Sequence, residues 1–408
     1  DVYKRQDDRV AELFVPVILI ISLLTFFIWV FFGGIDVVSH GLFAALSVLV
    51  VACPCVVGLA TPVALAAGLN KAARNHILIR DTSALEQMRN VDVVVFDKTG
   101  TLTEGHPTVI GWLWAQGQEE HYKDVLLAAE STSDHPLAEA IVTALEGEEQ
   151  VIPAHLDGFE NITGKGVRVA YQGAEYWVGS HKLLKDYQAN LSDILADMLT
   201  QYESDGNSIV YFGRENDLLA VIAIKDQLRV TSMEAIRELR IQDIEICMLT
   251  GDGERTASSV AGSLGIMRFV ADAMPDDKED FIHKLQLQGK TVAMVGDGVN
   301  DAQALSCADV SIAMGKGTDT LMDTAMITLR TSDLLLLPKV FRLSRQTVSL
   351  MYRNLFWAFI YNTVGIFVAA GVLYPVYDIL LSPALAGAAM ALSCVSVALS
   401  SLRLSSRF

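Results

Sequence analysis

Long stretches without a charged residue dominate both ends of the chain. There are four of them, two near each terminus: Leu13–Ile35, Val37–Asn70, Asn354–Tyr377 and Ile379–Leu402. A helix of about 20 apolar residues spans the hydrocarbon core of a bilayer, so each stretch is long enough to cross a membrane. Asp36 separates the first two and Asp378 the last two. The sequence therefore predicts four transmembrane helices, arranged as two hairpins on either side of a long polar segment.

The charge pattern gives these hairpins a direction. Basic residues flank the outer ends of both hairpins, whereas the tips carry no Lys or Arg. Because positively charged flanks stay in the cytosol, we expect both termini and the middle segment to be cytosolic. The mean hydropathy of +0.36 is high for a soluble protein. The formal net charge of −17 argues against nucleic acid as a partner.

The middle segment alternates short apolar runs with helical patterns. The runs Val91–Phe96, Ile244–Leu249 and Thr291–Val295 are each followed closely by Gly, Asp or Thr. This order is typical of a parallel α/β sheet with its site at the carboxyl ends of the strands. A stretch with strands and turns of its own lies between the first two runs and predicts an inserted domain. The expected organisation is a hairpin at 1–76, an α/β domain at 77–104 and 217–337, an inserted domain at 105–216, and a second hairpin at 338–408.

Three of the polar motifs in this segment suit phosphate chemistry. The string Asp97–Thr101 follows the first run, and a carboxylate at a strand end before a tight loop suits nucleophilic attack on phosphorus. The string Thr250–Asp252 follows the second run, where a Thr hydroxyl can hold a phosphate oxygen. Lys278 is a candidate counter-charge for the phosphate. An ordinary turn explains Thr250–Asp252 alone and a solvated side chain explains an isolated Lys, whereas the five-residue string Asp97–Thr101 is rare.

A fourth motif, Gly296–Asp301, follows the third apolar run. Clustered carboxylates at a strand end can hold Mg²⁺ through oxygen ligands. The alternative is a loop rich in Gly and Asp, but the string is too dense in both to favour that interpretation.

The second uncharged stretch contains Cys53-Pro54-Cys55. Pro54 lacks an N–H and should break the helix within the membrane. Two thiols at such a break favour a soft ion such as Cu(I), or Zn(II). The alternatives are buried apolar cysteines or a zinc-ribbon turn, and the latter lacks a partner pair. The chain has 5 cysteines, an odd number that does not favour a disulfide framework.

Taken in order, the four polar motifs resemble the haloacid-dehalogenase-type phosphotransferase core, specifically that of P-type ATPases. The resemblance implies that Asp97 is the phosphorylated nucleophile, and that Mg²⁺ binds Asp97, Asp297 and the Thr99 carbonyl. Phosphatase relatives carry an acid–base Asp where this chain has Thr99. The phosphoaspartate should therefore hydrolyse slowly, which favours a pump over a membrane-anchored phosphatase.

The same resemblance assigns the remaining residues of the soluble part. Thr250, Gly251 and Lys278 would hold the phosphoryl oxygens, while Asn300 and Asp301 complete the loop. The string Ser133–Ala140 contains His135-Pro136 and is similar to the adenine site of heavy-metal pumps. This similarity implies that ATP binds through four residues: Glu130, His135, Gly164 and Gly166.

The membrane stretches resemble the copper branch of these pumps. The expected ligands of the transported ion are Cys53, Cys55, Tyr361, Asn362, Met390 and Ser393. Cys394 stands where the family has Ser and keeps a soft donor there. The zinc and cadmium branch uses a Lys and an Asp in the last two helices, and neither occurs in those stretches here. The resemblance thus implies export of Cu(I), with Ag(I) as a surrogate.

We therefore expect a multi-pass protein of a bacterial inner membrane that uses ATP and Mg²⁺. A soluble metal chaperone is a further expected partner. We also expect the chain to be part of a longer pump, because it lacks the Thr-Gly-Glu loop of the actuator domain. The alternatives are a Zn(II)/Cd(II) exporter and a membrane protein that binds metal without transporting it.

Overall fold

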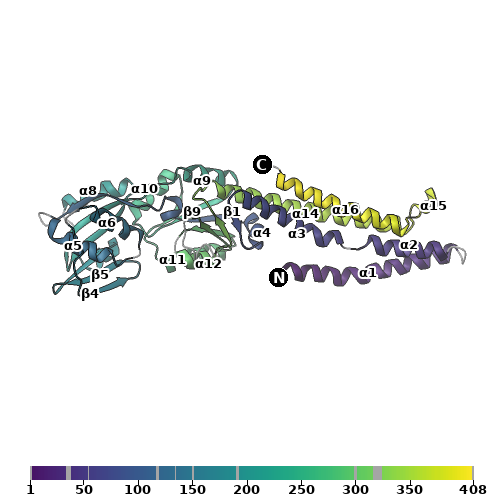
Figure 1. Ribbon diagram of the computed structural model, residues 1–408, viewed down its shortest axis with the longest axis horizontal. Coiled ribbons are helices and arrows are strands. Elements are labelled where there is room, and N and C mark those ends of the chain that lie inside the picture. The colour runs from purple at the N-terminus through teal and green to yellow at the C-terminus, as the bar shows by residue number, and fades with distance from the viewer. Residues whose placement is uncertain are drawn as a thin grey trace. The chain divides into compact units, whose positions relative to one another are not determined.

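The computed structural model divides into two compact units, residues 76–340 and residues 1–75 together with 341–408. Figure 1 shows the helices and strands of each unit. The structure describes residues 2–33, 38–53, 55–115, 119–133, 135–148, 151–189, 193–297, 301–315 and 324–406.

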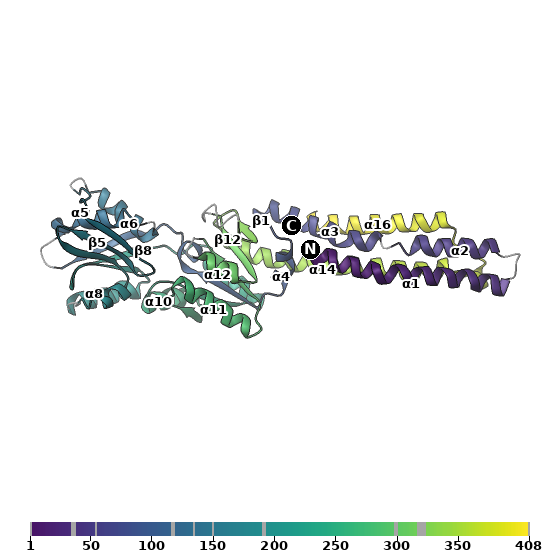
Figure 2. The ribbon, with the colours of Figure 1, turned by 90° about the horizontal axis from the view of Figure 1, so that it is seen from below.

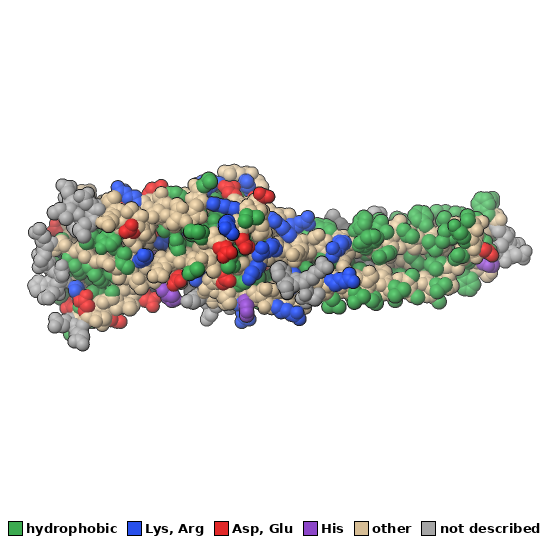
Figure 3. Space-filling model, turned by 90° about the horizontal axis from the view of Figure 1, so that it is seen from above, with side chains coloured by type: hydrophobic (Ala, Val, Ile, Leu, Met, Phe, Trp, Pro, Cys, Tyr) green, Lys and Arg blue, Asp and Glu red, His purple; other side chains and the backbone are tan. Residues whose placement is uncertain are grey.

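The discontinuous unit is helical. Its helices are α1 (Val2–Gly33), α2 (Val38–Val51), α3 (Cys55–Arg74), most of α14 (Leu336–Ala369), α15 (Tyr374–Tyr377) and α16 (Pro383–Ser406). Apolar side chains cover much of the face of this unit that Figure 3 shows, and many large apolar residues of the described helices are exposed. A helical bundle in lipid requires an apolar exterior. Helices suit that environment because each one satisfies its own backbone polar groups.

Two described helices, rather than the expected four, are long and apolar enough to span a membrane, at Val15–Phe32 and Pro383–Leu404. The second expected span is divided at Cys53, which lies outside both α2 and α3, and α2 has only 14 residues. The third expected span lies in α14, which ends at Ala369. The last 18 residues of α14 include Arg353, and this charged residue lowers the mean hydropathy of that segment.

The first sheet of the α/β unit has seven strands in the order β1-β13-β12-β11-β2-β9-β10. Only β1 is antiparallel to its neighbour. The central strands are buried along their whole length, as expected for a parallel sheet covered on both faces. The strands are β1 (Ile77–Ile79), β2 (Val93–Asp97), β9 (Glu245–Leu249), β10 (Arg268–Val270), β11 (Val292–Gly296), β12 (Val310–Met314) and β13 (Ile327–Leu329).

Helices connect these strands, and a five-residue π-turn, η2 (Lys98–Leu102), follows β2. The helices are α4 (Ser83–Arg89), α9 (Ser232–Ile241), α10 (Glu254–Leu264), α11 (Pro275–Leu287) and α12 (Ala302–Cys307). The expected parallel α/β architecture is confirmed, because β2, β9 and β11 correspond to the three apolar runs within two residues.

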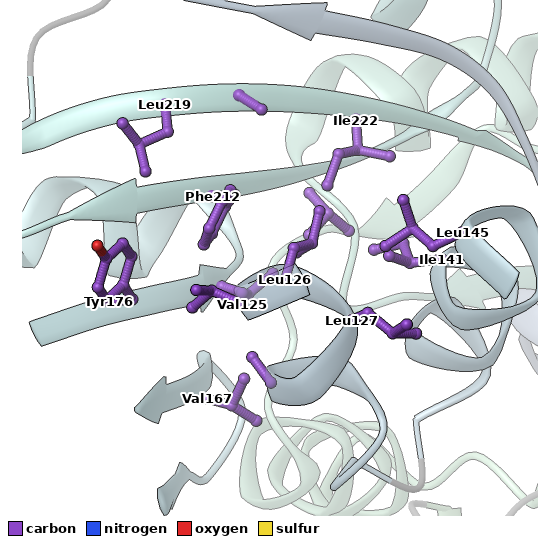
Figure 4. Packing of buried hydrophobic residues seen from close by; sticks show 14 of the residues in the cluster. Val125, Leu126, Leu127, Ile141, Leu145, Val167, Tyr176, Phe212, Leu219 and Ile222 are labelled. Carbon is purple, nitrogen blue, oxygen red and sulfur yellow. The ribbon is translucent and has the colours of Figure 1, made fainter. Parts of the chain in front are cut away.

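The second sheet is antiparallel throughout, with six strands in the order β3-β8-β7-β6-β5-β4. Its strands are β3 (Thr108–Trp114), β4 (Gly158–Ile162), β5 (Gly166–Tyr171), β6 (Ala174–Gly179), β7 (Ser208–Arg214) and β8 (Asp217–Lys225). The helices of this domain are α5 (Glu119–Glu130), α6 (Pro136–Glu146), α7 (His181–Asp186) and α8 (Asp193–Ser204). Side chains of α5 and α6 pack on the sheet in the core that Figure 4 shows.

The inserted domain extends further than we expected. β8 pairs with both β7 and β3, so it belongs to the second sheet and not to the α/β domain. The predicted boundary at Asn216 is therefore wrong, and the sheet continues to Lys225. The reason is local: Glu215, with a positive φ of 48°, lies in the tight turn of a hairpin rather than in a linker.

Candidate active site

Three neighbouring parallel strands end at one place on the first sheet. Asp97 is the last residue of β2, Thr250 follows β9, and Asp297 follows β11. β9 and β11 are the two neighbours of β2 in the sheet. The sheet order thus brings together side chains that lie far apart in the sequence, at the edge where parallel α/β sheets bind ligands.

Lys278, on α11, is the counter-charge of this site. Its Nζ lies 2.5 Å from Asp97 Oδ1 and 2.7 Å from Asp301 Oδ1. All three side chains are buried. Burial alone would lower the pKa of Lys278, but the carboxylates of Asp97 and Asp301 outweigh it and raise the pKa. Lys278 is therefore a fixed positive charge beside the nucleophile that we predict.

The carboxylates of Asp97, Asp297 and Asp301 fit a hard cation. One oxygen of each lies within 4.8 Å of the others. Burial, together with the nearby Asp97 carboxylate, raises the pKa of Asp297 and of Asp301 to about 7. A bound cation would relieve this concentration of acidic groups, and Mg²⁺ prefers oxygen ligands. Asn300, which we expect in the same loop, lies outside the described residues.

Gly100 allows this acidic cluster to form. Its φ is +70°, and a Cβ added there would lie 1.4 Å from Asp297 Oδ2. A side chain at this position would be strained and would also occupy the place of the carboxylate. Thr99, the preceding residue, has an extended backbone with φ −74° and ψ 129°. The turn after β2 thus holds its backbone against the acidic cluster.

A buried ion pair links the loops after β2 and β9 to the second sheet. Lys98 forms an ion pair with Asp252, and Lys98 Nζ also donates to Ser208 Oγ at 3.1 Å. Ser208 Oγ in turn donates to Asp252 Oδ1 at 2.8 Å, and Thr250 Oγ1 donates to Asp252 Oδ2 at 2.9 Å. Although burial opposes it, the Lys98 charge holds the pKa of Asp252 below its ordinary value. Gly251 lies between Thr250 and Asp252 and is exposed.

Asp226 and Arg229 hold the turn η2 and the adjoining Thr103 in place, and we did not predict either residue. Arg229 Nε donates to the Thr101 carbonyl at 3.0 Å, and its Nη2 donates to the Gly100 carbonyl. Thr103 Oγ1 donates to Asp226 Oδ2. Asp226 could have been found, since like Asp97 it is a carboxylate directly after a buried strand. Nothing in the sequence distinguishes Arg229 from a surface arginine.

Glu130 and His135 lie on either side of the turn between α5 and α6. Glu130 ends α5 and is 6% exposed, and burial raises its pKa to about 7. His135 is the N-cap of α6, where its Nδ1 accepts from the Leu137 N–H at 3.2 Å. The His135 ring is close enough to Asp252 to interact with it electrostatically. Burial lowers the pKa of the His135 ring, and the Asp252 carboxylate opposes this shift.

Gly164 and Gly166 occupy the hairpin between β4 and β5, and both have positive φ, at +69° and +142°. A Cβ on Gly166 would lie 2.1 Å from the Val178 carbonyl, and one on Gly164 would lie 2.5 Å from Met274 Cε. The packing of β5 on β6 thus gives Gly166 a structural role of its own.

The predicted metal-ion ligands lie in the helical unit. Cys53 lies between α2 and α3; Cys55 begins α3, and its side chain is outside the described part. On α14, Asn362 is buried, whereas Tyr361 is 46% exposed and stacks on Trp357.

The two predicted ligands on α16 are half-buried. They are Met390 and Ser393. Ser393 Oγ is buried without a hydrogen-bond partner, which marks it as a polar group available to a ligand. The next residue, Cys394, packs against a small apolar cluster formed by Ala60, Ala358 and Val397.

A known protein family covers this part of the chain. Residues 91–309 match the family model of the haloacid dehalogenase-like hydrolases. The matched range includes the whole second sheet, strands β2, β9, β10 and β11 of the first sheet, and each acidic residue of the cluster. The fold and the site therefore define a haloacid dehalogenase-like hydrolase domain with a second domain inserted in it.

Relatives that match nearly the whole chain identify its family more closely. The chain is 42% identical over 98% of its length to a copper-exporting P-type ATPase of Legionella pneumophila, covering 54% of that protein. It is 43% identical over 99% of its length to a silver exporting P-type ATPase of Salmonella typhimurium, covering 49% of it. The chain thus spans about half the length of the curated relatives it matches.

Solved structures show the same relationship. A zinc-transporting PIB-type ATPase in the E2.Pi state is similar with a TM-score of 0.69 and 32% identity, over 97% of this chain and 63% of that one. The catalytic domain of the CPx-ATPase CopB-B is similar with a TM-score of 0.56 and 28% identity, over 67% of this chain and 97% of that one. The chain belongs to the heavy-metal branch of the P-type ATPases.

Proposed function

We propose that this chain is part of an ATP-driven exporter of a soft heavy-metal ion, Cu(I) or Ag(I), that works through an aspartyl-phosphate. The observation that carries the proposal is the position of Asp97. It ends the central strand β2, is paired with Lys278, and faces the carboxylates of Asp297 and Asp301. The curated relatives named above export copper or silver.

In the proposed reaction an Asp97 carboxylate oxygen forms a bond to the γ-phosphorus of ATP. The bond from that phosphorus to the β–γ bridging oxygen breaks, and ADP leaves. Lys278 and the Thr250 hydroxyl would hold the phosphoryl oxygens, as expected for a transfer governed by positioning and charge. Mg²⁺ at Asp97, Asp297 and the Thr99 carbonyl would neutralise charge on the transferred group. Thr99 cannot act as a base, so the phosphoaspartate would persist.

We propose that ATP reaches Asp97 from the inserted domain. His135 and Glu130 would line its adenine pocket, and the hairpin with Gly164 and Gly166 would lie along the nucleotide. The electrostatic effect of the Asp252 carboxylate on the His135 ring, which caps α6 of the inserted domain, supports this path.

The metal path would use Cys53, Cys55, Tyr361, Asn362, Met390 and Ser393. A monovalent ion is favoured because the described parts of α14 and α16 within the uncharged stretches contain no Lys or Asp. We propose that four segments cross the membrane. They are the spans Val15–Phe32 and Pro383–Leu404, the pair α2 and α3, and the apolar part of α14. The protein would then lie in a bacterial inner membrane with its α/β unit in the cytosol. A soluble metal chaperone would deliver the ion to it.

Formation of an acid-stable, hydroxylamine-sensitive phosphoenzyme from labelled ATP and Mg²⁺ tests the enzymatic proposal. Asp97→Asn should abolish the label, because an amide is not a nucleophile here. Asp276→Asn changes an exposed carboxylate on α11 and should leave the label unchanged. Equal labelling in the Asp97→Asn protein would refute the assignment.

The choice of ion is tested separately in the same assay. Cu(I) or Ag(I) under reducing conditions should raise phosphoenzyme formation, and Met390→Ala should remove this response. Leu392→Ala truncates an exposed residue on the same helix and should keep it. Stimulation by Zn(II) without stimulation by Cu(I) would favour the zinc-exporting alternative.

A further inference from the structure

A second group of metal-binding side chains lies outside the phosphoryl-transfer site. Glu279 and His283 are one helical turn apart on α11, and Cys307 is the last residue of α12. α11 and α12 pack together, as the two ribbon views agree (Figure 2). One ligand atom of each residue lies within 4.8 Å of the others. Three different donor types, oxygen, nitrogen and sulfur, therefore converge between two helices.

The spacing of these donors fits tetrahedral coordination. Cys307 Sγ lies 3.3 Å from Glu279 Oε1, and His283 Nε2 lies 3.5 Å from the same oxygen. Zinc bonds of about 2.0 Å to nitrogen and oxygen and about 2.3 Å to sulfur would place tetrahedral ligand atoms about 3.3–3.5 Å apart. Two of the three distances between donor atoms therefore already match these values, and the third, from Cys307 to His283, is within 4.8 Å.

Gln286 fixes which nitrogen of His283 faces the cluster. Gln286 Nε2 donates to the Cys307 carbonyl at 2.9 Å and to Asp309 Oδ2 at 3.2 Å. These two acceptors orient the amide, so Gln286 Oε1 is left as an acceptor, 3.2 Å from His283 Nδ1. The proton of neutral His283 then lies on Nδ1, and the lone pair of Nε2 points to the cluster. Metal-binding histidines are commonly oriented by such an outer hydrogen bond.

We propose that Glu279, His283 and Cys307 form a binding site for a borderline divalent cation, Zn(II), with water completing the coordination. The thiol donor excludes Mg²⁺ and Ca²⁺, which prefer oxygen, and a single sulfur beside a carboxylate does not favour Cu(I). The site opens to solvent, because the His283 side chain is 51% exposed and Glu279 is 35% exposed. On binding, the Cys307 thiol releases its proton to solvent.

The location of the site would couple it to phosphorylation. Glu279 follows Lys278 on α11, and α12 begins directly after Asp301. The Lys278–Asp301 ion pair therefore joins the same two helices that the bound cation would join. An ion at this site would fix the relative position of the two residues that surround Asp97. This regulatory consequence rests on the proposed function, whereas the binding site does not.

The test uses the full chain in detergent, with Cys53→Ser and Cys55→Ser introduced to remove the cysteine sulfur atoms of the proposed metal path. Co(II) replaces Zn(II) as a spectroscopic probe, because coordination by a thiolate produces a charge-transfer band. We expect one Co(II) per chain with this band, displaced by Zn(II) and not by Mg²⁺. Cys307→Ser should abolish the band, and His283→Ala should weaken binding at least about tenfold.

Three further variants separate coordination from folding. Gln286→Ala should weaken Co(II) binding by about 10–100-fold, as for other outer-sphere partners. Cys394→Ser and His155→Ala remove the same side-chain types elsewhere and should leave binding unchanged. A missing band in the parent chain, a band that survives Cys307→Ser, or displacement by Cu(I) but not by Zn(II) would overturn the proposal.

Discussion

At the scale of single residues, Glu130 makes folding depend on pH. Burial raises its pKa from 4.5 to about 7, so the folded state binds the proton more tightly than the unfolded state. The free energy of unfolding should therefore fall as pH rises from 4.5 to 7. Glu130→Gln removes this titration. We expect the variant to match the parent near pH 4 and to exceed it by up to about 3 kcal/mol at pH 8.

Denaturant unfolding at the two pH values measures this difference. Glu139→Gln, an exposed change on the neighbouring helix α6, is the control and should follow the parent at both pH values. If Glu130→Gln shows the same dependence on pH as the parent, Glu130 does not titrate in this range.

Gly100 is the residue at which the backbone limits the chemistry. Gly100→Ala would place a methyl group against Asp297, and we expect phosphoenzyme formation to fall at least about 100-fold. The control is Gly289→Ala, which has a similar φ of +79° but no atom within 4 Å of the added Cβ. It should lose about 1–2 kcal/mol of stability from backbone strain alone and retain phosphorylation. Similar losses of labelling in both variants would mean that strain, not the displaced carboxylate, is responsible.

The sequence predicted these residues unevenly, for physical reasons. Asp97 and Asp297 could be found because each follows a run of buried apolar residues, and the sheet order then brings them together. Arg229 could not be found because its role depends on three-dimensional contacts with backbone carbonyls, which leave no pattern in the sequence. Asp252 was seen as part of a turn, but its pairing with Lys98 and Ser208 depends on the meeting of two domains.

At the scale of secondary-structure elements, the turn η2 depends on a side chain from outside it. Arg229 donates to two of its carbonyls, and Ser232 Oγ donates to the Leu102 carbonyl at 2.7 Å. Arg229→Lys keeps the charge but loses the planar fork that reaches both carbonyls. We expect a loss of about 1–3 kcal/mol in stability and a lower rate of phosphoenzyme formation.

Thermal unfolding and quench-flow labelling would measure these two effects. Arg237→Lys, on the exposed side of α9, is the matched control and should change neither. An Arg229→Lys protein that labels at the parental rate would mean that η2 keeps its shape without the guanidinium.

Elements with a strong periodic pattern were easier to predict than their connections. β2 and β11 are buried along their whole length and β9 along all but its first residue, so their type and position could be predicted from their apolar composition. β8 was misassigned because a short hairpin turn and an interdomain linker contain similar residues. Of the four expected membrane helices, two are found as continuous apolar spans in the described residues. Cys53 interrupts another of the uncharged stretches, and α14 ends at Ala369.

At the scale of the whole molecule, residues 76–340 form a compact unit with both sheets and their cores. We expect this unit to fold without the helical unit and to bind ATP. His135→Gln should weaken ATP binding about tenfold with an unchanged circular dichroism spectrum. Calorimetry measures the affinity, and His155→Gln, an exposed histidine of the same domain, is the control. Equal affinity in the His135→Gln protein would return His135 to a purely structural role as a helix cap.

The chain enters the inserted domain on β3 and leaves it on β8, and these two strands are paired neighbours, with Thr108 opposite Lys225. The inserted segment thus begins and ends on neighbouring strands of the second sheet. For the first sheet, an insertion whose ends are already joined acts as a short loop, so the entropy of closing β2 onto β9 does not grow with its length. A domain attached in this way can be lengthened, reshaped or exchanged during evolution without disturbing the core that receives it. The turn after β2 and the inserted domain can therefore diversify at different rates within one polypeptide.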